Sequence, residues 1–357
     1  MQEFERILPE GEDVWERLSR EERPLVVYGM GNGADKLFGR LSELGKTPVA
    51  VFASDGFVRG QSFRGYRVQT LADIEKTYPD FVILVSFATR LPEVMEAIFS
   101  LATRHTLYLP DMPVSGNTYF TRTFMEEHAD QLAAVYARLA DEPSRRIFSA
   151  VLAYKITGDV SYLESGYSDV AEEYACFSER SVHTVIDGGA YNGDTAREMM
   201  ENLPQLSRII AVEPDPKTFK RLQKFAADHD IVQPIQAGLW SEEGEASFAS
   251  GGNRNSSLVG ASYEHRDVTV PLVSVDMLAT EPIDYIKYDV EGAERQALLG
   301  SRETILRDRP VLGISLYHRS EDLFDLPLLL DSIRSDYRFY VRRRRCLPAW
   351  EIMLYAV

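Results

Sequence analysis

The sequence predicts an α/β protein that contains two Rossmann-like, doubly wound domains joined by helices. Apolar strand patterns alternate with helical patterns over residues 24–114 and again from residue 182 onward, which predicts parallel sheets covered by helices on both faces. In both regions the first apolar run ends in a glycine-rich turn that opens a helix, as in a nucleotide-binding βαβ unit. The length of 357 residues is ample for two domains with separate cores.

The first domain, predicted over residues 1–114, begins with a short apolar strand and its turn. Gly29, Gly31 and Ala34 have the spacing of a dinucleotide fingerprint, and Asp55 follows where an acid can bind ribose. Nucleotide or nucleotide-sugar binding is one interpretation. The other is a structural or interaction role, because a tight strand-to-helix turn also needs glycine. The elements expected are strands at 25–28, 49–52, 81–85 and 106–109 and helices at 35–44, 71–77 and 91–102.

Residues 115–180 are predicted to form a helical connector or lid. Apolar residues recur at three- and four-residue spacings, for example at Leu132, Val135 and Leu139. The segment also holds several tyrosines, among them Tyr174. Two roles are open: packing on the sheet of the next domain, or adding aromatic side chains to a substrate pocket.

The second domain, predicted over residues 181–357, opens with the most informative turn of the chain. An apolar strand ends at Asp187, and Asp194 stands on the other side of the glycines. A second strand ends in Glu213, where a carboxylate can accept both hydroxyls of a ribose. Two acids without a P-loop lysine disfavour a phosphate ligand, but they suit S-adenosylmethionine with its ammonium and sulfonium groups. The alternative is a plain turn in which Asp194 and Thr195 only start a helix.

The rest of this domain continues the alternation of strands and helices. The elements expected are helices at 216–228, 291–307 and 322–335 and strands at 232–236, 268–273, 284–289, 311–316, 339–341 and 352–355. The glycine- and serine-rich stretch 250–258 is predicted to be a loop that is either mobile or in contact with a ligand.

The composition indicates which binding partners the protein disfavours and in which cellular compartment it is expected. Lys and Arg total 39 against 55 Asp and Glu, and the net charge of −16 repels nucleic acid and anionic membranes. No apolar run reaches the roughly 18 residues that span a bilayer, and no signal-peptide pattern opens the chain, so a cytoplasmic protein is expected. Cys176 and Cys346 are too few for a disulfide framework or a thiolate zinc site. Arg342–Arg345 is expected on a solvated strand or turn, with a patch for an anionic group as the alternative.

Several ordered segments resemble the FkbM family of S-adenosylmethionine-dependent methyltransferases. They are Val185–Thr195, Ala211–Asp215, Lys287–Glu294, Ser315–Phe324 and Met353–Ala356. The resemblance implies a seven-stranded class I methyltransferase sheet, S-adenosylmethionine as cofactor, and methylation of a hydroxyl on a sugar or other polyhydroxylated natural product. The partner implied is a small-molecule or glycan acceptor, not nucleic acid or a membrane, and a homodimer stays open.

The resemblance also implies a cofactor site. Asp187 and the backbone around Gly189 are expected to hold the methionine portion, Glu213 the ribose, and the segment after the third strand the adenine. The full set of expected cofactor-binding residues is Asp187, Gly188, Gly189, Asn192, Asp194, Thr195, Glu213, Pro214, Gly238 and Asp289.

The predicted catalytic residues are Asp289, His318 and Glu291. Methyl transfer from a sulfonium is an in-line displacement, so a hydroxyl oxygen has to be aligned with the methyl group. Asp289 ends a buried strand at the sheet edge where ligands bind, and is expected beside the methyl. His318 is the expected base because its ordinary pKa lies near working pH. The alternatives are a structural histidine, first-turn helix charge for Glu291, and a divalent ion on these three side chains; no metal is predicted.

Two other functions compete with methyl transfer. One is a dinucleotide-dependent oxidoreductase that uses the turn Gly29–Ala34, although no hydride-transfer residues are evident near it. The other is a non-catalytic binding protein with a methyltransferase fold. Three acids retained at one sheet edge, Asp187, Glu213 and Asp289, argue against a domain that has lost its chemistry.

Overall fold

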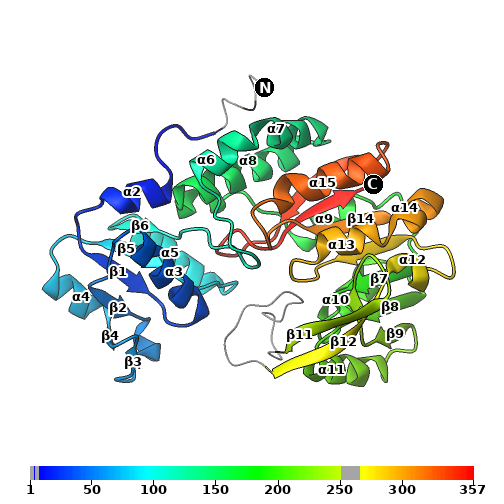
Figure 1. The fold of residues 1–357 in the computed structure, drawn as a ribbon, viewed down its shortest axis with the longest axis horizontal. Coiled ribbons are helices and arrows are strands. Elements are labelled where there is room, and N and C mark those ends of the chain that lie inside the picture. The colour runs from blue at the N-terminus through cyan, green and yellow to red at the C-terminus, as the bar shows by residue number, and fades with distance from the viewer. Residues whose placement is uncertain (1–3, 5–7, 251–265) are drawn as a thin grey trace.

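A computed structural model describes residues 4, 8–250 and 266–357. Figure 1 shows two α/β units beside each other, with helices of the middle segment lying across the top. We call residues 8–114 the N-terminal unit and residues 181–357 the C-terminal unit. No helix in the described ranges has the length and apolar character needed to cross a membrane.

The N-terminal unit is built on a six-stranded sheet with the order β3-β4-β2-β1-β5-β6. All neighbours pair in parallel except the short hairpin of β3 and β4, so the Rossmann-like sheet expected from the sequence is confirmed. Its strands are β1 Leu25–Tyr28, β2 Ala50–Phe52, β3 Ser62–Phe63, β4 Tyr66–Gln69, β5 Val82–Val85 and β6 Thr106–Tyr108. Its helices are α2 Val14–Arg20, α3 Asn32–Glu43, α4 Leu71–Thr77 and α5 Pro92–Ala102, with a 3₁₀ turn at Asp55–Phe57.

The middle segment is mostly helical and ties the two units together. It contains α6 Arg122–Glu127, α7 Ala129–Arg138, α8 Glu142–Thr157, a 3₁₀ turn at Val160–Leu163, and α9 Val170–Ala175. Asp141 caps α8 and pairs with Arg342 of the last sheet at 2.6 Å. One apolar cluster includes Val26, Phe148 and Ile314, which belong to the N-terminal unit, the middle segment and the C-terminal unit. The core is therefore continuous between the units.

The C-terminal unit has a seven-stranded sheet with the order β15-β16-β14-β13-β7-β8-β9. Strand β16 is antiparallel to both of its neighbours and the other pairs are parallel, which confirms the predicted class I methyltransferase sheet. Its strands are β7 Thr184–Gly188, β8 Arg208–Val212, β9 Val232–Ile235, β13 Tyr285–Tyr288, β14 Val311–Ser315, β15 Phe339–Arg343 and β16 Ile352–Ala356. Its helices are α10 Asp194–Asn202, α11 Pro216–Ala226, α12 Val275–Leu278, α13 Glu294–Leu299, α14 Arg302–Asp308 and α15 Asp322–Ile333.

Two features of this unit differ from the expectation. The single helix predicted over 291–307 is divided into α13 and α14, because the chain packs at Gly300 against the Trp240 backbone, where no side chain would fit. A small extra sheet is formed by β10 Gly238–Leu239, β11 Gly244–Ser250 and β12 Arg266–Val273. The loop predicted at 250–258 lies, beyond residue 250, outside the described residues.

Candidate active site

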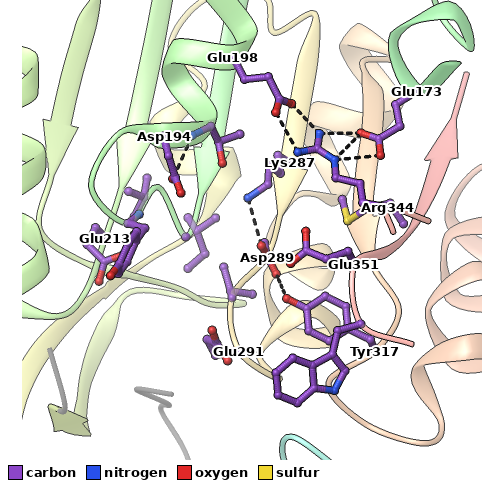
Figure 2. A pocket seen from close by; sticks show the side chains of 18 of the residues that line it. Glu173, Asp194, Glu198, Glu213, Lys287, Asp289, Glu291, Tyr317, Arg344 and Glu351 are labelled. Carbon is purple, nitrogen blue, oxygen red and sulfur yellow. Dashed lines mark hydrogen bonds and ion pairs between the residues drawn. The ribbon is translucent and has the colours of Figure 1, made fainter. Parts of the chain in front are cut away.

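A cavity of about 350 Å³ opens at the carboxyl ends of β7, β8 and β13. In Figure 2, Asp194 and Glu213 lie on one side of the view, Arg344 and Glu351 on the other, and Lys287 and Asp289 between them. The lining residues used below are Arg90, Val114, Glu173, Gly189, Asp194, Thr195, Glu198, Glu213, Pro214, Gly238, Lys287, Asp289, Glu291, Tyr317, Arg344, Trp350 and Glu351.

Asp187 lies at the end of β7 and is fully buried beneath the turn. Burial raises the pKa of Asp187 to about 6, although the nearby Lys287 lowers it. The Lys287 Nζ is 3.7 Å from the Asp187 Oδ1 atom. The next turn residue, Gly189, has φ +78° and passes so close to the Asp289 carbonyl that a side chain there would collide with it. The glycine therefore brings the β7 and β13 ends together under the cavity floor.

Glu213 lies at the end of β8 and faces the cavity with both oxygens fixed. The backbone N–H of Tyr191 donates to one oxygen at 3.0 Å, and that of Asp215 donates to the other at 2.8 Å. A carboxylate oxygen has two lone pairs, so each can accept one more hydrogen bond from a ligand. Burial raises the pKa of Glu213 to about 7 in spite of these two bonds.

The other expected cofactor residues divide into two groups. Asp194 and Thr195 at the start of α10 line the cavity, as do Pro214 and Gly238. Gly188 is buried behind the lining, and Asn192 accepts the Asp194 N–H at 3.2 Å and so closes the turn. These two positions shape the turn and are not among the lining residues.

Asp289 follows β13 and is the centre of a polar network. Its carboxylate accepts hydrogen bonds from Ser315 Oγ at 2.8 Å and Tyr317 Oη at 3.0 Å, and from Lys287 Nζ at 3.3 Å. Burial alone would raise the pKa of Asp289, but Lys287, His318 and these hydroxyls hold it well below its usual range. Asp289 is therefore ionised at any pH at which the protein works.

Glu291 and His318 lie beside Asp289 but differ in their access to the cavity. Of the Glu291 side chain, 27% is exposed, whereas the His318 side chain is 0% exposed. Glu291 has a left-handed backbone with φ +55°, a conformation that non-glycine residues seldom adopt. Burial raises the pKa of Glu291 to about 8, although the neighbouring His318 lowers it.

His318 is enclosed by carboxylates. Its Nδ1 is 2.9 Å from Glu294 Oε1, and its Nε2 is 3.5 Å from Glu291 Oε2 and 3.7 Å from Asp289 Oδ1. Burial lowers the pKa of His318, but these three acids outweigh burial and raise it to about 10. At neutral pH the ring is therefore an imidazolium, which cannot accept a further proton.

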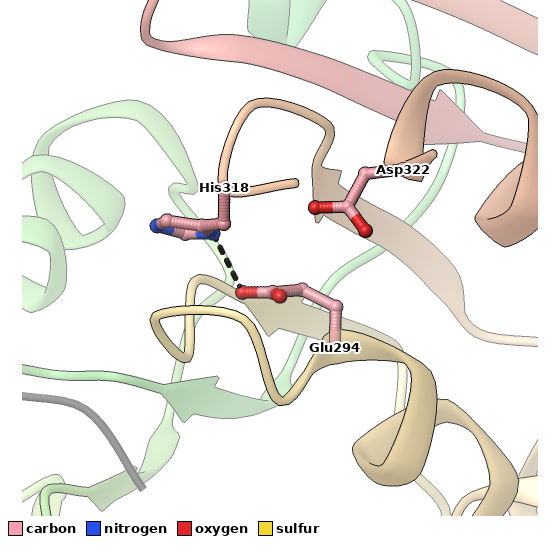
Figure 3. Close-up of side chains that lie close together, drawn as sticks. All are labelled: Glu294, His318 and Asp322. Atoms are coloured by element: carbon pink, nitrogen blue, oxygen red, sulfur yellow. Dashed lines mark ion pairs between the residues drawn. The ribbon is translucent and has the colours of Figure 1, made fainter. Parts of the chain in front are cut away.

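On its inner side His318 meets two buried acids, Glu294 and Asp322 (Figure 3). The three side chains bring one possible ligand atom each to within 4.8 Å of one another. Burial and the adjacent Glu294 raise the pKa of Asp322 to about 8. These three buried side chains form one charged cluster in which Glu294 faces the His318 ring.

Several lining residues were not predicted from the sequence. Lys287 was within reach of sequence reasoning, because residues two apart on a strand share a face and Asp289 was already a candidate. Trp350 lines the cavity, whereas Trp240, which ends the segment expected beside adenine, is not among the described lining residues. Tyr174 of the middle segment does line the cavity, so the predicted connector also contributes an aromatic side chain.

The prediction for the arginine run was wrong. Arg342 is buried, and Arg343 is fully buried and donates to the carbonyl oxygens of Leu163, Gly166 and Cys346. Arg344 lines the cavity, where it pairs with Glu173 at 2.7 Å and Glu198 at 2.6 Å. These arginines face backbone carbonyls and carboxylates brought in by the middle segment and α10, which the local sequence does not reveal.

Comparison with known proteins agrees with this architecture. Residues 187–339 match the family described as Methyltransferase FkbM domain. The crystal structure of the methyltransferase FkbM from Methylobacillus flagellatus KT is similar over 98% of this chain and 95% of that chain, with 20% identity and a TM-score of 0.74. That match extends over both units. A search of curated proteins gave no match.

Two further structures have more limited likeness. Fibrillarin from Aeropyrum pernix, solved with natively bound S-adenosyl-L-methionine, matches 50% of this chain and 67% of its own, with 16% identity and a TM-score of 0.32. Precorrin-6y C5,15-methyltransferase from Geobacter metallireducens GS-15 matches 52% of this chain and 86% of its own, with 12% identity and a TM-score of 0.34. The sheet topology agrees with the match of residues 187–339 to the FkbM methyltransferase domain, and the C-terminal unit has the fold of S-adenosylmethionine-dependent methyltransferases.

Proposed function

We propose that the protein transfers a methyl group from S-adenosylmethionine to a hydroxyl of a sugar or other polyhydroxylated small molecule. The observation that carries this proposal is the convergence of Glu213, Asp289 and Glu291 on one cavity, above the buried Asp187. The acids match the charge of the cofactor, which has ammonium and sulfonium groups but no phosphate. Lone pairs on both Glu213 oxygens suit the two ribose hydroxyls.

In the proposed reaction the acceptor oxygen attacks the methyl carbon as the carbon–sulfur bond breaks. The bond electrons stay on sulfur, the cofactor leaves as a neutral thioether, and the hydroxyl proton passes to a base. Glu291 is the base in this proposal, because it reaches the cavity and its pKa of about 8 is close to working pH. The base role expected of His318 therefore moves to Glu291, and the imidazolium of His318 positions Glu291 and Asp289.

Asp289 has a different task in this proposal. As a carboxylate that stays ionised, it accepts a hydrogen bond from the acceptor and fixes its orientation, while Lys287 and Tyr317 hold its own position. The exposed part of the wall, with Tyr317, Trp350 and Glu351, offers aromatic faces and a hydrogen-bond acceptor. Such a wall suits the apolar faces and the hydroxyl groups of a sugar ring.

Two measurements test the proposal. Isothermal titration should detect binding of S-adenosylmethionine and of its demethylated product. Transfer of label from tritium-labelled S-adenosylmethionine to a panel of neutral methyl glycosides should then identify an acceptor. If the protein binds neither form of the cofactor, the proposed function is wrong; if it binds both but methylates no glycoside, the acceptor class is wrong.

A further inference from the structure

The first glycine-rich turn packs closely against the segment that follows β5. A side-chain carbon added to Gly29 would lie 2.6 Å from the Phe87 ring, and one added to Gly33 would collide with the Ser86 carbonyl. Phe87 also packs against Tyr28, with ring centres 4.9 Å apart. This segment follows β5, next to β1 at the point where the strand order reverses. Gly29 and Gly33 therefore serve the close approach of Ser86 and Phe87, whereas a side-chain carbon at Gly31 would meet no atom of the described residues within 4 Å.

The same segment continues directly into the methyl-transfer cavity. Thr89 and Leu347 exchange two backbone hydrogen bonds, with N–O distances of 2.7 and 3.0 Å. The next residue, Arg90, forms an ion pair with Glu351, and both side chains line the cavity. A second segment, at the end of the N-terminal unit, places Val114 on the cavity wall. The backbone N–H of the next residue, Ser115, donates to the His318 carbonyl at 2.8 Å.

Glu351, the ion-pair partner of Arg90, has an unusual backbone conformation. Its backbone is left-handed, with φ +58°, and only 19% of its side chain is exposed. In the view of Figure 2 it lies on the opposite side of Asp289 from Glu213. Because Glu213 marks the proposed ribose end, Glu351 belongs to the acceptor end.

The charges of the wall favour an uncharged, hydroxyl-rich group at this end. Among the lining residues that the structure describes, each of the three cationic side chains already faces a carboxylate: Arg90 faces Glu351, Lys287 faces Asp289, and Arg344 faces Glu173 and Glu198. A phosphorylated acceptor would have to compete with these pairs. A hydroxyl group instead donates to a carboxylate that an arginine holds in place.

We propose that the N-terminal unit is the acceptor-recognition part of the enzyme and that Arg90 determines specificity by holding Glu351 to receive hydroxyl groups of a neutral polyol. The inference rests on the proposed function. It gives the Rossmann-like unit a task in methyl transfer.

The test compares Arg90→Ala, Arg90→Lys and Glu351→Gln with the wild type, using the methyl glycoside that gives the highest turnover. We expect Arg90→Ala and Glu351→Gln to raise the acceptor KM about 10-fold, while the cofactor Kd from titration stays within about twofold. Arg90→Lys should restore part of the loss. The matched control is Glu96→Gln, which removes the ion pair with Arg345, another contact between the units but outside the cavity lining. It should leave the acceptor KM unchanged.

Other outcomes overturn the inference in distinguishable ways. If Arg90→Ala has the acceptor KM of the wild type, the N-terminal unit does not recognise the acceptor. If Glu96→Gln raises KM as much as Arg90→Ala, the effect comes from unit packing. Saturable binding of NAD⁺ that Asp55→Ala abolishes would restore the nucleotide interpretation of the first turn. Failure of the wild type to bind S-adenosylmethionine would instead remove the proposed function itself.

Discussion

The two glycine-rich turns of this protein look alike in sequence but face different surroundings. Both follow a buried strand and open a helix, at Asn32 in the N-terminal unit and at Asp194 in the C-terminal unit. The second turn borders a cavity lined by carboxylates, whereas Gly29 and Gly33 of the first turn pack against Ser86 and Phe87. The comparison teaches that a glycine-rich turn brings strand ends close together, and that the side chains on those strand ends decide the charge of the site.

The largest effect on activity is expected from a substitution of the proposed base in the C-terminal unit, Glu291. Glu291→Gln should lower kcat by about 100- to 10,000-fold, the range typical of general acid–base catalysis, and leave the cofactor Kd within about twofold. Methyl transfer to the best methyl glycoside gives kcat, and titration gives Kd. A variant that keeps wild-type kcat would show that Glu291 accepts no proton.

A second test compares the acid after the second strand of each unit. Glu213→Ala should weaken S-adenosylmethionine binding about 10- to 100-fold, because a ribose would lose charge-assisted hydrogen bonds. Asp55→Ala, the corresponding change in the N-terminal unit, should leave cofactor affinity unchanged. Titration of both variants checks this, and equal losses would mean that the cofactor is placed wrongly.

The pH dependence sharpens the assignment of the base. Glu291 has to be ionised to accept a proton. We therefore expect a rising limb in the pH profile of kcat, with its midpoint near pH 8. Asp289 remains ionised across this range and adds no limb. Single-turnover rates between pH 6 and pH 9 measure the limb, which Glu291→Gln should abolish. A limb that persists in this variant would assign it to another group.

The smallest expected effect is on stability, through His318. Its pKa is raised from 6.5 to about 10 in the folded protein, so the stabilisation is fully present below pH 6.5 and is lost as pH rises toward 10. Thermal unfolding of the wild type should therefore show Tm falling over this range. His318→Gln should flatten the fall, whereas His105→Gln in the N-terminal unit should not. An unchanged slope in His318→Gln would contradict the assignment.

Much of the fold and part of the site could be predicted from sequence because they depend on local patterns. Strand and helix periods gave both parallel sheets, and acids at strand ends identified Glu213 and Asp289 as neighbours at one sheet edge. The base was assigned to His318 from its ordinary pKa, but the acids around it in space change that pKa. Glu294, the acid closest to the ring, comes from α13, and no sequence spacing near His318 reveals that contact.

By itself, the sequence determined that the chain has two α/β units and that the second has acids at the ends of neighbouring strands. Only the tertiary structure decided that Arg344 and Arg90 belong to the cavity, and that Glu291 is accessible while His318 is not. The physical reason is that periodicity and turn chemistry act over a few residues. Burial and charge at a site depend on side chains that packing brings together from distant parts of the chain.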